Sequence, residues 1–133
     1  MENHSVKRVL IIEDDTSMLA LASRILRKDG YDVFEAMRAE QALELVARED
    51  FHVVLTDIFM PGIGGIEAIL RIHQIKPGLP VVVMSAGYGG MPGETATEAA
   101  MRVGAAAVVD KPLNAKQMLA AIATAIKGVA GNS

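Results

Sequence analysis

The stretch Val9-Leu10-Ile11-Ile12-Glu13-Asp14-Asp15 joins a short apolar run directly to three acidic residues. The run shows none of the polar alternation expected of a strand with one face in water, so it predicts a strand buried on both faces. Four further runs of this kind follow along the chain. They are Asp32–Ala36, which is the weakest, Val53–Thr56, Val81–Met84 and Ala107–Val109.

Helical apolar spacing fills the intervals between these predicted strands. The apolar positions are Met18, Ala22, Ile25 and Leu26; Ala39, Ala42, Leu43, Val46 and Ala47; Ile66, Ile69 and Leu70 after Gly65; Ala96, Ala100 and Val103 before Gly104; and Leu119, Ile122 and Ile126. The last helix is expected from Asn114, as its cap, to about Lys127. Parallel strands need crossover connections, and helices supply them. The alternation therefore predicts an α/β fold, a parallel sheet covered by helices on both faces.

Composition fits one ordinary globular domain. The 133 residues are 51% apolar and 22% charged, and we expect the domain over residues 1–128 with a frayed tail over 129–133. The formal charge of -3 leaves no basic surplus for binding nucleic acid directly. The chain has no cysteine, no apolar run of membrane-spanning length and no signal-peptide core, so we expect a cytoplasmic protein that does not contact a membrane.

Polar side chains follow directly after four of the predicted strands. They are Glu13-Asp14-Asp15, Asp57, Ser85 and Asp110-Lys111-Pro112. Ligands of open α/β sheets bind at this edge, outside the carboxyl ends of the strands. Carboxylates gathered there repel one another, by about 4 kcal/mol for two charges ~4 Å apart at an effective dielectric near 20. A hard divalent cation such as Mg²⁺ offsets that repulsion and favours phosphate oxygens, and a carboxylate can be the nucleophile of phosphoryl transfer.

Four segments, in this order, resemble the signature of bacterial response-regulator receiver domains. They are Val9-Leu10-Ile11-Ile12-Glu13-Asp14-Asp15, Thr56-Asp57-Ile58-Phe59-Met60-Pro61-Gly62, Met84-Ser85-Ala86 and Asp110-Lys111-Pro112. The similarity covers essentially the whole chain. It implies a doubly wound, flavodoxin-like (βα)5 three-layer sandwich with strand order 2-1-3-4-5. It also implies that Asp57 accepts a phosphoryl group from a histidine kinase or a histidine phosphotransfer protein, and that a downstream protein partner carries the output.

The same resemblance assigns a role to each strand-end residue. Glu13 and Asp14 match the acidic pair that holds Mg²⁺ together with Asp57 and the main-chain carbonyl of Phe59. Ser85 matches the switch hydroxyl, and Lys111 matches the lysine that contacts the phosphate. Each of these residues also has a purely structural interpretation. Asp57 could be a turn residue, and Glu13 and Asp14 could form the acidic first turn of a helix capped by Asp15 or Thr16. Ser85 could satisfy a backbone group, and Lys111 could be a solvated charge. A cis bond before Pro112 would turn the lysine ammonium inward.

The chain departs from the family pattern at three places. Val108 stands where receivers usually carry an aromatic switch residue. The interval from Ser85 to Lys111 is longer than usual, and the excess coincides with a glycine-rich loop at residues 87–93, the most mobile candidate in the chain. Phe59 and Gly87 occupy positions that hold a hydrolytic water in rapidly dephosphorylating receivers, and neither side chain can do so.

The sequence leaves two other functions open. A receiver fold that docks without phosphoryl chemistry is slightly favoured by Val108 and disfavoured by the intact strand-end residues. A flavin or nucleotide enzyme would need a phosphate-friendly first loop, where this chain has Glu13, Asp14 and Asp15 and no glycine-rich lysine loop. The histidines, His4, His52 and His73, share no spacing typical of a metal site, and we expect them at the surface.

Overall fold

The computed structural model describes residues 6–59, 62–85 and 93–131, with side chains of the last segment described over 98–128. The strands are β1 (Arg8–Ile12), β2 (Asp32–Ala36), β3 (Val53–Asp57), β4 (Val81–Ser85) and β5 (Ala107–Asp110). The helices are α1 (Thr16–Lys28), α2 (Ala39–Arg48), α3 (Gly65–Ile75), α4 (Gly93–Arg102) and α5 (Ala115–Gly131). All strand pairings are parallel and the order is β2-β1-β3-β4-β5, which confirms the expected α/β topology.

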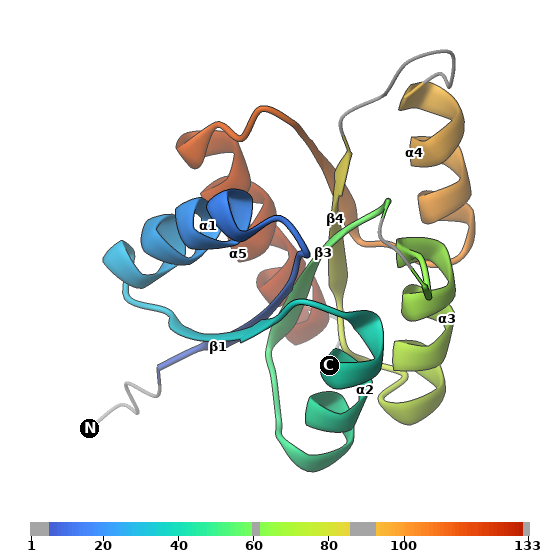
Figure 1. Ribbon diagram of the computed structural model, residues 1–133. Coiled ribbons are helices and arrows are strands. Elements are labelled where there is room, and N and C mark those ends of the chain that lie inside the picture. Colours follow the sequence, from blue (N-terminus) through green and yellow to red (C-terminus); the bar gives the residue numbers. More distant parts are fainter. Residues whose placement is uncertain (1–5, 60–61, 86–92, 132–133) are drawn as a thin grey trace.

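The sheet is the middle layer of three, with α1 and α5 on one face and α2, α3 and α4 on the other (Figure 1). Alternate residues of β1 point into different apolar layers. Val9 and Ile11 pack with the helices of the first face, and Leu10 and Ile12 with those of the second. All four are fully buried, which is why the strand carries an unbroken apolar run.

Three strands extend one residue beyond their predicted ends, and each extra residue is polar. They are Asp57 at the end of β3, Ser85 at the end of β4 and Asp110 at the end of β5. Main-chain hydrogen bonds continue the sheet at this edge: the amide of Ile58 donates to the Met84 carbonyl at 3.2 Å, and that of Lys111 to the Ser85 carbonyl at 2.9 Å. The strand-end side chains therefore start from main chain that the sheet holds in place.

The predicted helices are all present, with corrections to their faces and ends. The prediction that Leu70 lies on the buried face of its helix is wrong, because its side chain is 43% exposed while that of its neighbour Ile69 is buried. Ala47 is also exposed. Asn114 does cap α5, its side chain accepting from the Gln117 amide at 3.0 Å. The helix continues to Gly131, beyond the predicted end near Lys127 and into the tail expected to fray.

Two of the histidines expected at the surface are half-buried. His52 accepts a hydrogen bond from the Arg8 amide at 2.9 Å, and His73 contacts the Leu79 carbonyl at 3.0 Å. His4 and the loop from Gly87 to Pro92 lie outside the described residues. Over the described helices, none is both long and apolar enough to cross a membrane.

Candidate functional site

The carboxyl ends of β1, β3, β4 and β5 bring together five of the predicted strand-end residues, which are Glu13, Asp14, Asp57, Ser85 and Lys111. Glu13, Asp57 and Ser85 are buried, with exposed fractions of 1%, 6% and 4%. Asp14 is exposed, so one acidic side chain of the group faces solvent. Sheet topology explains the convergence: β1 and β4 flank β3 on either side, and β5 lies beyond β4.

Lys111 links the two buried carboxylates. Its Nζ lies 3.1 Å from Oε1 of Glu13 and 3.2 Å from Oδ1 of Asp57. The side chain is only 11% exposed, so the ammonium points into the site and is not a solvated charge. The Lys111–Pro112 peptide bond is cis, the isomer that the sequence left open.

Glu13 is held by two donors on different oxygens. Oε1 accepts from Lys111, and Oε2 accepts from the Asp15 amide at 3.1 Å. Burial is the largest influence on this carboxyl and raises its pKa above the ordinary value; the Asp57 charge acts in the same direction, and the two hydrogen bonds only partly oppose them. Without a further cation, the buried site therefore resists the ionised form of Glu13.

For Lys111, burial is the largest influence and on its own would lower the pKa. The hydrogen bond to Glu13 and the charges of Asp57 and Glu13 together outweigh it and raise the pKa of the ammonium above its ordinary value. The lysine is therefore a permanent cation at neutral pH. It supplies one positive charge against three carboxylates.

Those three carboxylates form a possible metal site. One oxygen each of Glu13, Asp14 and Asp57 can be chosen so that all lie within 4.8 Å of one another. An all-oxygen, negatively charged donor set with one exposed member suits a hard divalent cation that keeps several waters. The excess negative charge, which Lys111 only partly neutralises, gives the same indication. The residues present therefore fit a bound divalent metal.

Ser85 carries the one unsatisfied buried side-chain polar atom among the described residues, its Oγ. Such groups are rare in folded proteins, because a buried hydroxyl without a partner loses its hydrogen bonds to water. The structural interpretation, in which the hydroxyl satisfies a nearby backbone group, is therefore not supported by the described part of the chain. The atom is available to a ligand at the sheet edge.

Two further residues, Asp15 and Phe59, lie close in sequence to the carboxylates of the possible metal site. Asp15 caps α1, its Oδ1 accepting from the amides of Ser17 and Met18, as predicted for the third acid of the run. Phe59 is partly buried, and its side chain packs against the apolar layer under α2 and α3. The use of its carbonyl as a metal contact stays a prediction.

Gly65, at the start of α3, shapes the site, and the sequence did not predict this role. A Cβ at this position would lie 2.6 Å from both the Asp57 carbonyl oxygen and the Ile58 Cα. The absence of a side chain therefore allows α3 to begin directly against the end of β3. The Gly64-Gly65 pair was a signal in the sequence, but it marked only a helix start.

Comparisons with known proteins agree on one family. Residues 9–123 match the family model described as response regulator receiver domain. The chain is 38% identical over 116 residues to the response regulator protein FleR of Pseudomonas aeruginosa, and 35% identical over 83 residues to sporulation initiation phosphotransferase F of Bacillus subtilis. These alignments cover 87% and 62% of this chain. They cover 24% of FleR and 66% of the phosphotransferase, so the chain spans about a quarter of the former.

Solved structures give the same result. The chain is similar to a CheY-like receiver domain protein from Methanospirillum hungatei, with a TM-score of 0.87 and 29% identity over 97% of this chain and 100% of that one. Receivers are signalling domains rather than enzymes, and their place in two-component signalling implies a kinase or phosphotransfer partner. With its acidic pocket at Glu13, Asp14 and Asp57, this chain belongs to the response regulator receiver domain family.

Proposed function

We propose that this chain accepts a phosphoryl group on Asp57 from the phosphohistidine of a sensor kinase or phosphotransfer protein, and that the modified domain changes how it binds a downstream protein. One observation carries the proposal: Lys111 joins Asp57 and Glu13 inside a buried acidic pocket, and the Ser85 hydroxyl at its edge has no partner among the described residues. A merely structural cluster of acids would not need that free hydroxyl.

The two oxygens of Asp57 have different surroundings. Oδ1 accepts hydrogen bonds from the Ile58 amide at 2.9 Å and contacts Lys111. Oδ2 has no such contact among the described residues, which supports its use as the nucleophile. It would form the new O–P bond as the P–N bond of the phosphohistidine breaks, and the electron pair of that bond would return to the imidazole nitrogen.

Glu13, Asp14 and Asp57 would hold Mg²⁺, with the Phe59 carbonyl as a further ligand. When bound, Mg²⁺ would neutralise negative charge on the phosphoryl oxygens. Lys111 would contribute the second positive charge, moving from its present carboxylate partners to a phosphoryl oxygen. Ser85 would then find the acceptor that it lacks, and its movement would report the modification to the rest of the domain.

Incubation with Mg²⁺ and acetyl phosphate tests the assignment. We expect one phosphoryl adduct, located at Asp57 by mass spectrometry, and none in Asp57→Asn. Asp110→Asn is the matched control, because Asp110 is an exposed acid at the same sheet edge and outside the acidic pocket. An adduct at another residue, or equal labelling of Asp57→Asn, would show that the site has been misassigned.

A docking module that works without phosphoryl chemistry is the second candidate. Val108 favours it, since this β5 residue packs against the apolar layer where an aromatic switch would normally stand. The same experiment separates the two candidates. An unlabelled chain that still binds its partner would support docking alone.

A further inference from the structure

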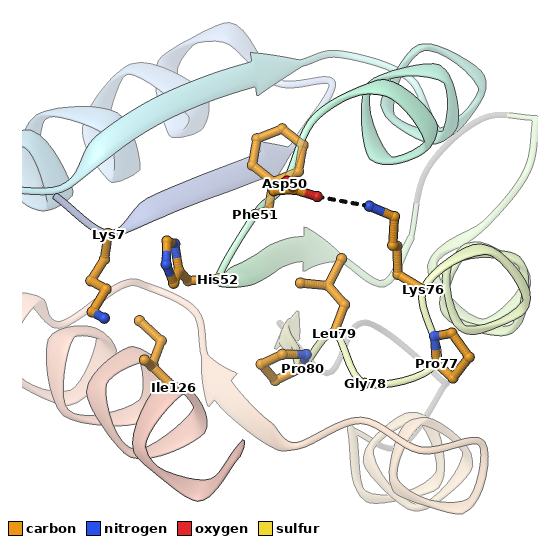
Figure 2. Close-up of a pocket in the computed structure, with 10 residues that line it drawn as sticks. All are labelled: Lys7, Asp50, Phe51, His52, Lys76, Pro77, Gly78, Leu79, Pro80 and Ile126. Atoms are coloured by element: carbon orange, nitrogen blue, oxygen red, sulfur yellow. Dashed lines mark hydrogen bonds and ion pairs between the residues drawn. The ribbon is translucent and has the colours of Figure 1, made fainter. Parts of the chain in front are cut away.

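A second cavity lies at the amino ends of the strands, the sheet edge opposite to the acidic pocket. Its volume is about 430 Å³, within the range of small-molecule sites. It is lined by residues just before three strands, Lys7 before β1, His52 before β3 and Pro80 before β4. Figure 2 shows Lys7, His52 and Ile126 at one end, and Lys76 and Pro77 at the other.

Most of this lining is apolar. The apolar residues of the lining are Phe51, Pro77, Leu79, Pro80 and Ile126. Leu79 is buried, while Phe51, Pro80 and Ile126 are half-buried, so apolar surface remains open to a ligand. Covering that surface would favour binding of an apolar body.

The polar groups at one end are hydrogen-bond donors. His52 Nδ1 accepts from the Arg8 amide, which can only donate, so Nδ1 is unprotonated and the neutral ring carries its proton on Nε2. Burial, followed by the charges of Lys7 and Arg8, lowers the pKa of this ring and favours that neutral form. Beside it, the Lys7 ammonium lies within ion-pair distance of no carboxylate among the described residues.

Four carbonyl acceptors around the cavity are already used. The carbonyls of Lys7, Asp50, Leu79 and Pro80 receive hydrogen bonds from Asp32, Arg8, His73 and Val54. The one lining carboxylate, Asp50, is 95% exposed and pairs with Lys76 at 3.0 Å. Within the described residues, the cavity therefore offers the Nε2 donor of His52 and the unpaired ammonium of Lys7, a combination that favours an anion over a cation.

We propose that this cavity binds a small organic carboxylate, its anionic group between Lys7 and His52 and its apolar body against Pro80 and the adjoining walls. Both donors would bond to the carboxylate oxygens, the one from Lys7 with charge assistance. The volume restricts the ligand to a small molecule. This site is independent of the phosphoryl chemistry, because it shares no residue with the acidic pocket.

Amide chemical shifts of the full chain, titrated with 4-phenylbutyrate and separately with 4-phenyl-1-butanol, test the proposal. We expect the acid to bind with a dissociation constant on the order of 1 mM and to shift residues 7, 52 and 79. The alcohol has the same apolar body without the charge, so it should bind roughly tenfold more weakly. Asp57→Asn should bind the acid as the wild type does.

Lys7→Gln should weaken binding of the acid roughly tenfold and leave binding of the alcohol unchanged. Lys28→Gln removes an exposed lysine elsewhere and should change neither. His52→Asn retains an acceptor for the Arg8 amide and removes the Nε2 donor, so it should weaken binding of the acid and leave binding of the alcohol unchanged. If His52→Asn is unstable, Lys7→Gln still tests the proposal, because Lys7 is exposed. Equal affinity for acid and alcohol, or shifts away from this cavity, would overturn the proposal.

Discussion

His52 shows how one side chain couples this fold to pH. Because its pKa lies below the ordinary 6.5, chiefly through burial, the unfolded chain binds a proton more readily than the folded one. The stability contributed by the neutral ring is therefore present above pH 6.5 and lost as the pH falls through the lower folded pKa. Urea unfolding between about pH 7.5 and 5 should show this loss in the wild type. His52→Asn should show a smaller decline, and an identical decline would contradict the assignment.

Asp57 carries an electrostatic cost when no metal is bound. Glu13, Asp14 and Asp57 place three negative charges around one Lys111 cation, and Asp57→Asn removes one charge while keeping an acceptor for Ile58 and Lys111. We expect the metal-free variant to be more stable by about 1 kcal/mol. Thermal unfolding in a chelator measures this difference.

Addition of Mg²⁺ should reverse the order, because a ligand that binds only the folded state stabilises it. The wild type should gain stability with rising Mg²⁺, and Asp57→Asn should gain much less. Asp110→Asn is the control for loss of one acid at this edge and should follow the wild type. A metal-free Asp57→Asn protein that melts below the wild type would mean that its contact with Lys111 outweighs the repulsion.

At the scale of elements, the start of α3 is fitted to the end of β3. Gly65→Ala would place a Cβ 2.6 Å from the Asp57 carbonyl oxygen and the Ile58 Cα, and main chain cannot move aside easily. We expect a loss of roughly 1–3 kcal/mol in the free energy of unfolding, together with slower phosphorylation. In Gly78→Ala the new Cβ meets nothing within 4 Å, so its stability should stay within about 0.5 kcal/mol. Denaturant unfolding of both variants checks the contrast.

The elements were predictable because each has a strong local signal, and their details were not. Apolar runs identified all five strands, most weakly β2, yet the last residues of β3, β4 and β5 are polar and belong to the sheet only through bonds to neighbouring strands. Leu70 fits the helical stripe but is exposed, since the face that α3 buries is centred on Ala68 and Ile72. The contact between Gly65 and β3 is likewise tertiary, and helix-start spacing cannot reveal it.

The candidate site was likewise predictable only in part: the sequence indicated which residues converge, and it did not indicate their side-chain contacts. Strand-end position alone brought Glu13, Asp57, Ser85 and Lys111 to one edge, because topology makes those ends converge. That Lys111 contacts both buried carboxylates, and that the Ser85 hydroxyl has no partner within the described structure, depends on side-chain placement. The cavity at the opposite edge could not be foreseen, since its lining comes from distant segments with no shared motif.

At the scale of the whole molecule, phosphorylation should be transmitted through residues 87–103. Ser85 stands directly before this segment, and Val108 removes the aromatic route that receivers usually have. The amide shifts of residues 98–103, at the end of α4 and beyond, should change on adding beryllofluoride and Mg²⁺, and Ser85→Ala should diminish the change. Shifts confined to the acidic pocket would show that this segment is not the switch.

The lifetime of the phosphorylated state sets how long the molecule signals. Hydrolysis needs a water in line with the phosphorus, and the positions that could hold it are Phe59, whose ring packs into the apolar layer, and Gly87, which has no side chain. Neither offers a polar group, so we expect slow hydrolysis, suited to a lasting signal or to transfer back to histidine. Phe59→Asn with Gly87→Glu should accelerate loss of the phosphoryl group by roughly ten- to a hundredfold, about 1.4 to 2.8 kcal/mol of barrier. Decay of the phosphoprotein after donor removal measures this rate. A wild-type lifetime of seconds, or a double variant no faster than the wild type, would mean that water reaches the phosphorus without help from these positions.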